Sequence, residues 1–372
     1  MPSTKDYTGF QIVSSHSDSP TFKIKENAEI SVSDNYIKLN SERYGGMLCS
    51  TWLDRPLSVA GRVMVNENNC ITTKLVNVDR DLLLIPNVAI HMNRNANDNM
   101  SYKANIDMTP LFGSMDAKGS FLKLIADECG VKEEEILSTD LFLYNRMAAS
   151  VWGANNEYIS APQLDDLECA FTSLKAFLNS NNDSAICVYS LFDNEEVGSG
   201  TKQGAASTFL YDTLTRVNFS LGQNAEYYNR AVASSFMLSA DNAHAVHPNH
   251  PEYSDPNNRV YMNNGIVIKY NANQKYTTDA VSAAVFKTIC DEVNVPTQVF
   301  TNRSDMAGGS TLGNISNAKV SLNTVDIGLA QLAMHSSYET AGVMDVEYMT
   351  DGITAFYNHT IKVKADGCLE IL

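Results

Sequence analysis

Three carboxylates, Asp193, Glu195 and Glu196, occur within four residues directly after an apolar stretch. That stretch, Ser184–Leu191, has the composition of a buried strand, and burying three carboxylates at its end is costly unless a cation offsets their charge. A metal ion would do so. It would also give the adjacent glutamates different tasks, because neighbouring side chains diverge, so that one can bind metal while the other faces a water molecule. A solvated acidic turn is the alternative that this stretch alone leaves open.

A histidine and an aspartate follow an earlier strand-like stretch, Gly9–Ser15. His16 and Asp18 are two residues apart, so on an extended chain they share a face. This pair suits a metal-binding imidazole with a carboxylate beside it. A polar cluster at a strand end, without a metal, is the alternative.

A pair of aspartates, Asp165 and Asp166, precedes a set of apolar residues with helical spacing. The members of this set are Leu167, Phe171, Leu174, Phe177 and Leu178. The spacing predicts a helix, with both aspartates at its N-terminus. Capping a helix needs only one of them, so the second hints at a ligand.

Another aspartate, Asp241, follows the apolar stretch Ala231–Leu238 and precedes His244, His247 and His250. Two interpretations remain open here. The His-x-x-His spacing suits a site for a single zinc ion, and the alternative is a site for two metal ions. Further along the chain, a single histidine, His335, follows an apolar strand end.

Two more side chains bear on binding. Lys269 lies inside the β-rich run Ile-Val-Ile-Lys-Tyr at 266–270, where it either faces solvent at a sheet edge or directs a positive charge into a cleft. His91 lies in the apolar run Val88–Met92, which favours a satisfied core or interface histidine.

The order of elements indicates how these side chains are positioned. Strands and helices alternate through residues 155–361, which predicts an α/β sheet with sites at its strand ends. Residues 21 to about 114 instead show β alternation between polar turns. We therefore predict a mixed sheet flanked by helices, with a small antiparallel barrel or sandwich inserted after its first strand. The expected boundaries are 1–20 and 155–372 for the main domain and 21–154 for the insert.

Composition excludes several kinds of partner. The chain has 372 residues, a net charge of −16 and a pI of about 4.8, which argues against nucleic acid and anionic membranes. No apolar run is long enough to span a bilayer, and the start of the chain, Met1–Tyr7, has no apolar region of the signal-peptide kind. Seven scattered cysteines without a C-x-x-C pair predict reduced thiols and a cytoplasmic location.

Taken together, the strand-end side chains predict a dinuclear metal site. Its expected members are His16, Asp165, Glu195 or Glu196, Asp241 and His335. Two zinc ions carry a charge of about +4, which three carboxylates and a hydroxide would balance, while histidines complete the coordination. The remaining glutamate could take a proton from the metal-bound water. The predicted chemistry is metal-assisted hydrolysis of an amide.

The same stretches, in the same order, resemble a known family. They are His16-Ser-Asp-Ser-Pro, Gln163-Leu-Asp-Asp, Phe192-Asp-Asn-Glu-Glu-Val-Gly-Ser, Asp241-Asn-Ala-His-Ala-Val-His-Pro-Asn, Gly265-Ile-Val-Ile-Lys and Met334-His-Ser. From Gly9 to the C-terminal helix the chain resembles the aspartyl aminopeptidases, a family of zinc metallopeptidases. The resemblance implies a discontinuous catalytic domain with an inserted β-rich lid and dimerisation domain. It also implies a homo-oligomer built from dimers, a tetrahedral dodecamer.

The resemblance further implies a role for individual residues. One zinc would be held by His16, Asp165 and Asp241, and the second by Asp165, Glu196 and His335. Glu195 would be the general base, and Asp18 would orient His16. Lys269 and Tyr276 would line the pocket for the first side chain of the substrate, and His91 would reach the site of a neighbouring subunit.

The expected function is removal of an acidic residue from the N-terminus of a peptide through a hydroxide bound by two metals. Zinc is the expected metal, with cobalt or manganese as alternatives. Other functions compatible with the residues are a neutral-residue aminopeptidase, a related deacylase or carboxypeptidase, and a catalytically weak assembly protein. The chain departs from the family pattern at Gln163, Asp166 and Tyr338, and only eight residues precede Gly9, which fits either a fragment or a compact form.

Overall fold

The computed structural model describes residues 5–98, 100–365 and 367–372, and the chain divides into two units, which we describe separately. The first unit comprises Met1–Ser19, Ser150–Met334 and Glu339–Leu372, and the second comprises Pro20–Ala149 and His335–Tyr338. Residues 1–4, part of the stretch inspected above for a signal peptide and of the expected main domain, lie outside the described residues.

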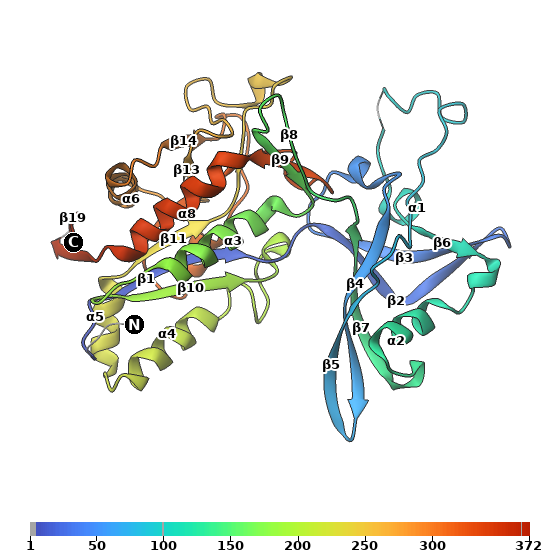
Figure 1. The fold of residues 1–372 in the computed structure, drawn as a ribbon, viewed down its shortest axis with the longest axis horizontal. Coiled ribbons are helices and arrows are strands. Elements are labelled where there is room, and N and C mark those ends of the chain that lie inside the picture. The colour runs from blue at the N-terminus through green and yellow to red at the C-terminus, as the bar shows by residue number, and fades with distance from the viewer. Residues whose placement is uncertain (1–4, 99, 366) are drawn as a thin grey trace. The chain divides into compact units, whose positions relative to one another are not determined.

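The first unit is built on a six-stranded sheet in the order β10-β1-β11-β15-β13-β14 (Figure 1). Its strands are β1 (Phe10–His16), β10 (Ile186–Phe192), β11 (Phe236–Ala240), β13 (Ile266–Tyr270), β14 (Thr297–Thr301) and β15 (Asn323–Gly328). All neighbouring strands are parallel except β13 and β15, which are antiparallel. The mixed sheet predicted from the sequence is therefore confirmed.

Helices cover both faces of this sheet, because side chains along each strand alternate between the faces. Val13 and Leu238 pack in one core with α3 (Leu164–Asn179), α6 (Ala280–Glu292) and α8 (Val343–Asn358). Ile12 and Met237, one position away, pack in another core with α4 (Phe209–Ser220), α5 (Ala225–Ala233) and α7 (Leu312–Ser316). The strands are thus buried on both sides, and polar side chains are left for their ends.

Smaller elements complete the first unit. A five-stranded sheet has the order β12 (Ala243–His244), β16 (Ala330–Leu332), β17 (Glu339–Gly342), β9 (Tyr158–Ala161) and β8 (Ser150–Trp152). β18 (Ile361–Ala365) and β19 (Cys368–Ile371) form a hairpin. The 3₁₀ turns are η4 (Glu195–Val197) and η5 (Pro251–Tyr253).

The second unit is a six-stranded, entirely antiparallel sheet in the order β5-β4-β7-β2-β3-β6 (Figure 1). Its elements are β2 (Thr21–Val32), β3 (Tyr36–Tyr44), η1 (Cys49–Trp52), β4 (Leu57–Glu67), β5 (Cys70–Asn77), α1 (Ala104–Asp107), β6 (Leu111–Ser114), η2 (Met115–Ala117), α2 (Phe121–Cys129), η3 (Glu133–Glu135) and β7 (Ile136–Asn145). Trp52 is buried against Phe22 in its core. The described residues of this unit form one sheet, so the two sheets of a sandwich are not found.

Helix α3 begins where its spacing predicts, but four of the five apolar side chains of the predicted set face outward, and Phe177 alone of the five packs against the core. Leu167, Phe171, Leu174 and Leu178 are 41%, 58%, 44% and 72% exposed, whereas Asp165 and Asp166 are buried. The inward face of the first turn is thus occupied by carboxylates. We take this inversion as a first sign that the buried acidic groups have a use.

Two predictions from composition can be compared with the structure. All seven cysteines are free, as expected. Among the described residues, no helix combines the length and apolar character needed to cross a bilayer.

Candidate metal centre

The site lies at the carboxyl ends of three neighbouring parallel strands, β10, β1 and β11. His16 is the last residue of β1 and is in register with Phe192, the last residue of β10. Asp241 directly follows β11. Because parallel strands end at the same edge of a sheet, His16, the loop after Phe192 and Asp241 are brought together there.

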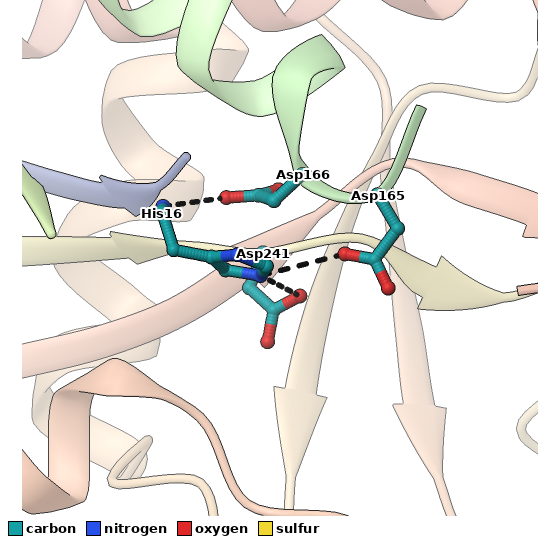
Figure 2. A group of neighbouring side chains, drawn as sticks. All are labelled: His16, Asp165, Asp166 and Asp241. Atoms are coloured by element: carbon teal, nitrogen blue, oxygen red, sulfur yellow. Dashed lines mark hydrogen bonds and ion pairs between the residues drawn. The ribbon is translucent and has the colours of Figure 1, made fainter. Parts of the chain in front are cut away.

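Four side chains form a compact group at this edge: His16, Asp165, Asp166 and Asp241 (Figure 2). Each offers one ligand atom, and these atoms all lie within 4.8 Å of one another. The His16 Nε2 atom is 3.5 Å from Asp165 Oδ1 and 3.9 Å from Asp241 Oδ1. The side chains of His16, Asp165 and Asp241 are 1%, 3% and 13% exposed, so the group is shielded from water.

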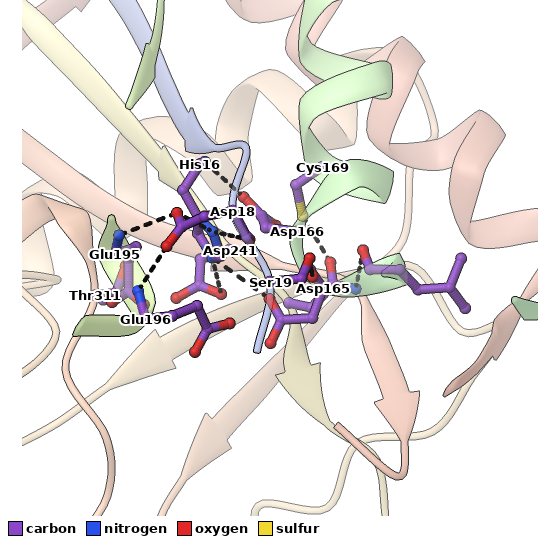
Figure 3. A network of polar contacts seen from close by, with 12 residues as sticks. His16, Asp18, Ser19, Asp165, Asp166, Cys169, Glu195, Glu196, Asp241 and Thr311 are labelled. Carbon is purple, nitrogen blue, oxygen red and sulfur yellow. Dashed lines mark hydrogen bonds and ion pairs between the residues drawn. The ribbon is translucent and has the colours of Figure 1, made fainter. Parts of the chain in front are cut away.

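The adjacent glutamates are held by Asp18. Its two carboxylate oxygens accept hydrogen bonds from the main-chain amides of Glu195, at 3.0 Å, and Glu196, at 3.1 Å (Figure 3). The main-chain carbonyl of Asp18 lies 3.0 Å from His16 Nδ1, and its carboxylate lies 3.5 Å from the same atom. Asp18 thus fixes the glutamate loop and one side of the imidazole, and the other ring nitrogen faces the carboxylates. His16, Glu195 and Glu196 also form a group whose ligand atoms lie within 4.8 Å.

The protonation of the glutamates reflects this crowding. Burial, with Asp241 and Asp165 nearby, raises the pKa of Glu195 to about 7. Burial, with Asp165 and Glu195 nearby, raises the pKa of Glu196 to about 10. Burial opposes protonation of His16, but the surrounding carboxylates raise its pKa well above the usual value. Each shift reports negative charge gathered in a buried place without enough positive charge to balance it.

The donor atoms of the cluster fit a divalent metal. Imidazole nitrogen and carboxylate oxygen are the ligands that zinc and similar ions take in proteins. Asp166 supplies a second indication: it is fully buried, and its Oδ1 atom makes no hydrogen bond among the described residues. A cation close to such a group would offset the cost of burying it.

Sequence reasoning missed the residues that hold the ligands in place. Asp166, noted only as a hint, accepts a hydrogen bond from the His16 amide at 3.0 Å. Glu339, which is 1% exposed, accepts one from the Asp165 amide at 2.9 Å, and the Ser19 hydroxyl donates to the Asp165 carbonyl at 2.8 Å. Asp166 follows a predicted ligand directly, which is a signal the sequence offers, whereas Glu339 and Ser19 carry none.

The other predicted residues have different places. Lys269 is buried on β13, so the solvent-facing alternative is wrong. Tyr276 is also buried, with its ring centroid 5.1 Å from Lys269 Nζ. His91 is exposed in a turn, so it is not a core histidine, while a position at an interface stays a prediction. His335 belongs to the second unit with Ser336–Tyr338, and its role as a ligand stays a prediction.

The mononuclear alternative finds no support. His244, His247 and His250 are exposed, and in the described residues no group of three or more nearby metal-binding side chains includes them. The ring of His250 instead stacks on Tyr253, with centroids 5.1 Å apart.

A mixed α/β sheet with a buried histidine and carboxylate cluster at its strand ends is typical of metal-dependent hydrolases. Residues 2–357 match the family described as Aminopeptidase I zinc metalloprotease (M18). The chain belongs to this M18 family of zinc aminopeptidases, and the recognition made from its motifs is confirmed.

Individual relatives agree with this assignment. The chain is 47% identical over 356 residues to a probable M18 family aminopeptidase 2 of Clostridium acetobutylicum, covering 94% of this chain and 82% of the relative. The structure is similar to a chain in the cryo-EM structure of the Ape4 and Nbr1 complex, with a TM-score of 0.91, 35% identity and coverage of 95% and 72%. It is also similar to the mApe1 dodecamer of S. cerevisiae, with a TM-score of 0.80, 27% identity and coverage of 94% and 80%.

Proposed function

We propose that this zinc aminopeptidase uses two divalent ions to hydrolyse the N-terminal peptide bond of peptides and prefers acidic first residues. The observation that carries the proposal is the gathering of His16, Asp165 and Asp241 in one group of ligand atoms, and of His16 with the two glutamates in a second group. A cluster of this composition has no structural need to be acidic, since burying like charges together costs stability.

The ligands follow from the cluster and from the family motifs. One ion would be held by His16, Asp165 and Asp241, and the other by Asp165, Glu196 and His335. The proximity of the first three ligand atoms supports the first assignment. The second rests on the sequence resemblance for His335. When bound, such ions polarise a carbonyl and lower the pKa of a water molecule.

Glu195 is proposed as the general base. Glu195 lies in the cluster with His16 and Glu196 but is not among the proposed ligands, so its carboxylate is left to accept a proton and return it. It would take the proton of the attacking water at its carboxylate and deliver it to the leaving amine nitrogen. Asp18 contributes by holding the Glu195 amide, and therefore the start of that side chain, in place.

The acidic preference is proposed from charge. Lys269 is the one lysine or arginine with a buried side chain among the residues that the structure describes. Its positive charge, with Tyr276 beside it, favours an Asp or Glu side chain nearby. The alternatives are preference for a neutral first residue, hydrolysis of N-acyl amino acids or of C-terminal residues, and a weakly active assembly protein.

Assembly and location complete the proposal. The dodecameric mApe1 supports a homo-oligomer for this chain, in which His91, exposed here, would reach the site of a neighbouring subunit. A cytoplasmic location stays a prediction from cysteine usage.

The test combines metal analysis with turnover of purified protein. Elemental analysis should find two ions per chain, and chelation should abolish hydrolysis of aminoacyl amides, with zinc, cobalt or manganese restoring it. Asp-amide and Glu-amide should be cleaved faster than Leu-amide, and N-acyl amino acids should not be cleaved. Retained activity after complete metal removal would refute the mechanism, and faster cleavage of Leu-amide would refute only the preference.

A further inference from the structure

We infer that Lys269 is a positioning residue for Asp241: its ammonium group holds both the main chain and the carboxylate of this metal ligand. The inference deepens the proposed function and rests on it, because it takes Asp241 to bind metal. It gives the buried lysine a task at the metal centre that is separate from the favourable field its charge would provide for an acidic substrate side chain.

The three donors of Lys269 are directed at one short segment. Its Nζ atom donates to the main-chain carbonyl of Asp241 at 2.7 Å and lies 3.3 Å from that of Asn242. The same atom lies 3.5 Å from Asp241 Oδ2. An ammonium group has three hydrogens, so these three acceptors match its full donor capacity. The Asp241 amide is bound in turn to the Ile327 carbonyl at 3.0 Å, which ties the segment to the sheet.

The carboxylate of Asp241 therefore has two sides. Its Oδ1 atom faces His16 and the other carboxylates, as Figure 2 shows, while Oδ2 faces the lysine. A ligand whose far oxygen is held by a cation keeps its near oxygen aimed at the metal. Groups that hold metal ligands in this way commonly change metal affinity or activity 10- to 100-fold when they are removed.

The surroundings of Lys269 suit a fixed cation. Its side chain is 2% exposed, and its Nζ atom lies 3.5 Å from Asp241 Oδ2. The ring centroid of Tyr276 is 5.1 Å from the same atom. A carboxylate and the face of an aromatic ring both attract an ammonium group, so the lysine is held by these two neighbours as well as by its hydrogen bonds to the main chain.

Positioning and recognition predict different kinetics. If Lys269 only recognised acidic side chains, its loss would raise KM for Asp-amide and leave Leu-amide and metal binding unchanged. If it positions Asp241, its loss weakens metal binding and lowers kcat for both substrates. The two roles can therefore be separated in one set of variants.

The test is Lys269→Met in the full chain, with Lys287→Met as a matched control. Lys287 also lies over a tyrosine, with Nζ 5.9 Å from the Tyr270 ring, but no ion pair joins it to Asp241 in the described structure. We expect Lys269→Met to bind zinc 10- to 100-fold more weakly in chelator competition. The visible absorption of its cobalt form should change, and kcat should fall alike for Asp-amide and Leu-amide. Lys287→Met should match the wild type.

Two further variants keep the test decisive. Lys269→Arg retains the charge and should recover most of the zinc affinity, whereas Lys269→Gln should lose it, and Lys269→Gln replaces Lys269→Met if the latter does not fold. An unchanged zinc affinity and cobalt spectrum, with a rise in KM for Asp-amide alone, would overturn the inference. Failure of the wild-type protein to bind zinc would instead refute the proposed function.

Discussion

Carboxylates behave in opposite ways in the two units. In the second unit, Asp140 pairs with Lys23 at 2.6 Å and with Arg62 at 2.8 Å, and these partners hold its pKa below the usual value. In the first unit, burial and neighbouring carboxylates raise the pKa values of Glu195 and Glu196 to about 7 and about 10. One arrangement favours the charged form and the other opposes it.

This difference indicates where function resides. A paired surface carboxylate such as Asp140 contributes to folding and needs no further explanation. A buried group of carboxylates that oppose one another costs stability, and proteins concentrate such groups at functional sites. Neutralising one of the buried carboxylates in the first unit should therefore change activity or even raise stability. Neutralising a paired surface carboxylate in the second unit should lower stability only slightly.

The largest expected effect is on turnover. Glu195→Gln removes the proposed base but keeps the side-chain shape, so kcat should fall by about 100- to 10,000-fold. The zinc content should stay unchanged, because Glu195 is not among the proposed ligands. Steady-state kinetics and elemental analysis of the same preparation measure both quantities.

Asp193→Asn is the control for that experiment. Asp193 precedes the same loop, and its carboxylate accepts a hydrogen bond from the neighbouring Asn194 amide at 2.8 Å. Its neutral variant should turn over at nearly the wild-type rate. An equal loss in both variants would mean that charge in the loop, and not the base, limits the reaction.

Metal removal should have the next largest effect, on stability. In metal-free protein the folded state keeps protons on Glu195 and Glu196 that the unfolded chain releases above pH 4.5, so stability falls as pH rises toward 7 and beyond. Bound zinc neutralises the same carboxylates and adds about 4 kcal/mol at a thousandfold excess over its dissociation constant. The difference in Tm between loaded and chelated protein should grow from about pH 6 to 9. If the Tm values of the two forms changed with pH in the same way, the carboxylate cluster would not be the group that zinc neutralises.

Glu168 is a buried carboxylate that is not among the proposed ligands, and its neutralisation should raise the stability of the first unit. Burial first, and Asp345 and Glu339 next, raise the pKa of Glu168 from 4.5 to about 8. The folded state therefore binds more protons than the unfolded state between these values, and stability falls as pH rises through them. Glu168→Gln cannot titrate, so it should be more stable than the wild type above pH 8 by on the order of 2 kcal/mol.

Denaturant unfolding of the zinc-loaded protein at about pH 5 and 8.5 measures this gain, which should nearly vanish at the lower pH. Glu347→Gln, at an exposed position on α8, should leave stability unchanged at both values. A loss of stability at the higher pH would mean that the Glu168 carboxylate is paired in a way its neighbours do not indicate.

How much of this could be read from the sequence depends on the kind of residue. Apolar runs followed by ligand-type side chains located the ends of β1, β10 and β11, and with them His16 and Asp241, because strand ends of a parallel sheet share an edge. The motifs also showed the resemblance to the aspartyl aminopeptidases, which the match to the M18 family confirmed. The apolar runs and the motifs are both local features of the sequence, so they can be recognised without a structure.

The residues that hold the ligands could not be found in this way. The Glu339 side chain reaches the Asp165 amide across 174 positions of sequence, and nothing near Glu339 marks it. His91 shows the limit of an apolar neighbourhood as a signal, since it suggested a core or interface position and the structure, which exposes the side chain, excludes the core. The sequence also could not show that the apolar stripe of α3 faces outward. Helical spacing indicates which residues share a face of the helix, but not whether that face is buried or exposed.

The smallest expected effect lies in the second unit. Asp140→Asn removes the charge that pairs with Lys23 and Arg62, whose side chains are 36% and 52% exposed, so the loss should be only about 0.5–1 kcal/mol. The folded pKa of Asp140 is lowered, so its contribution is present above the unfolded value of 3.8 and is lost as pH falls below it. Salt of about 1 M should screen most of it, whereas the gain from Glu168→Gln should persist because that group is buried. Equal salt sensitivity of the two variants in denaturant unfolding would mean that burial does not separate the carboxylates of the two units.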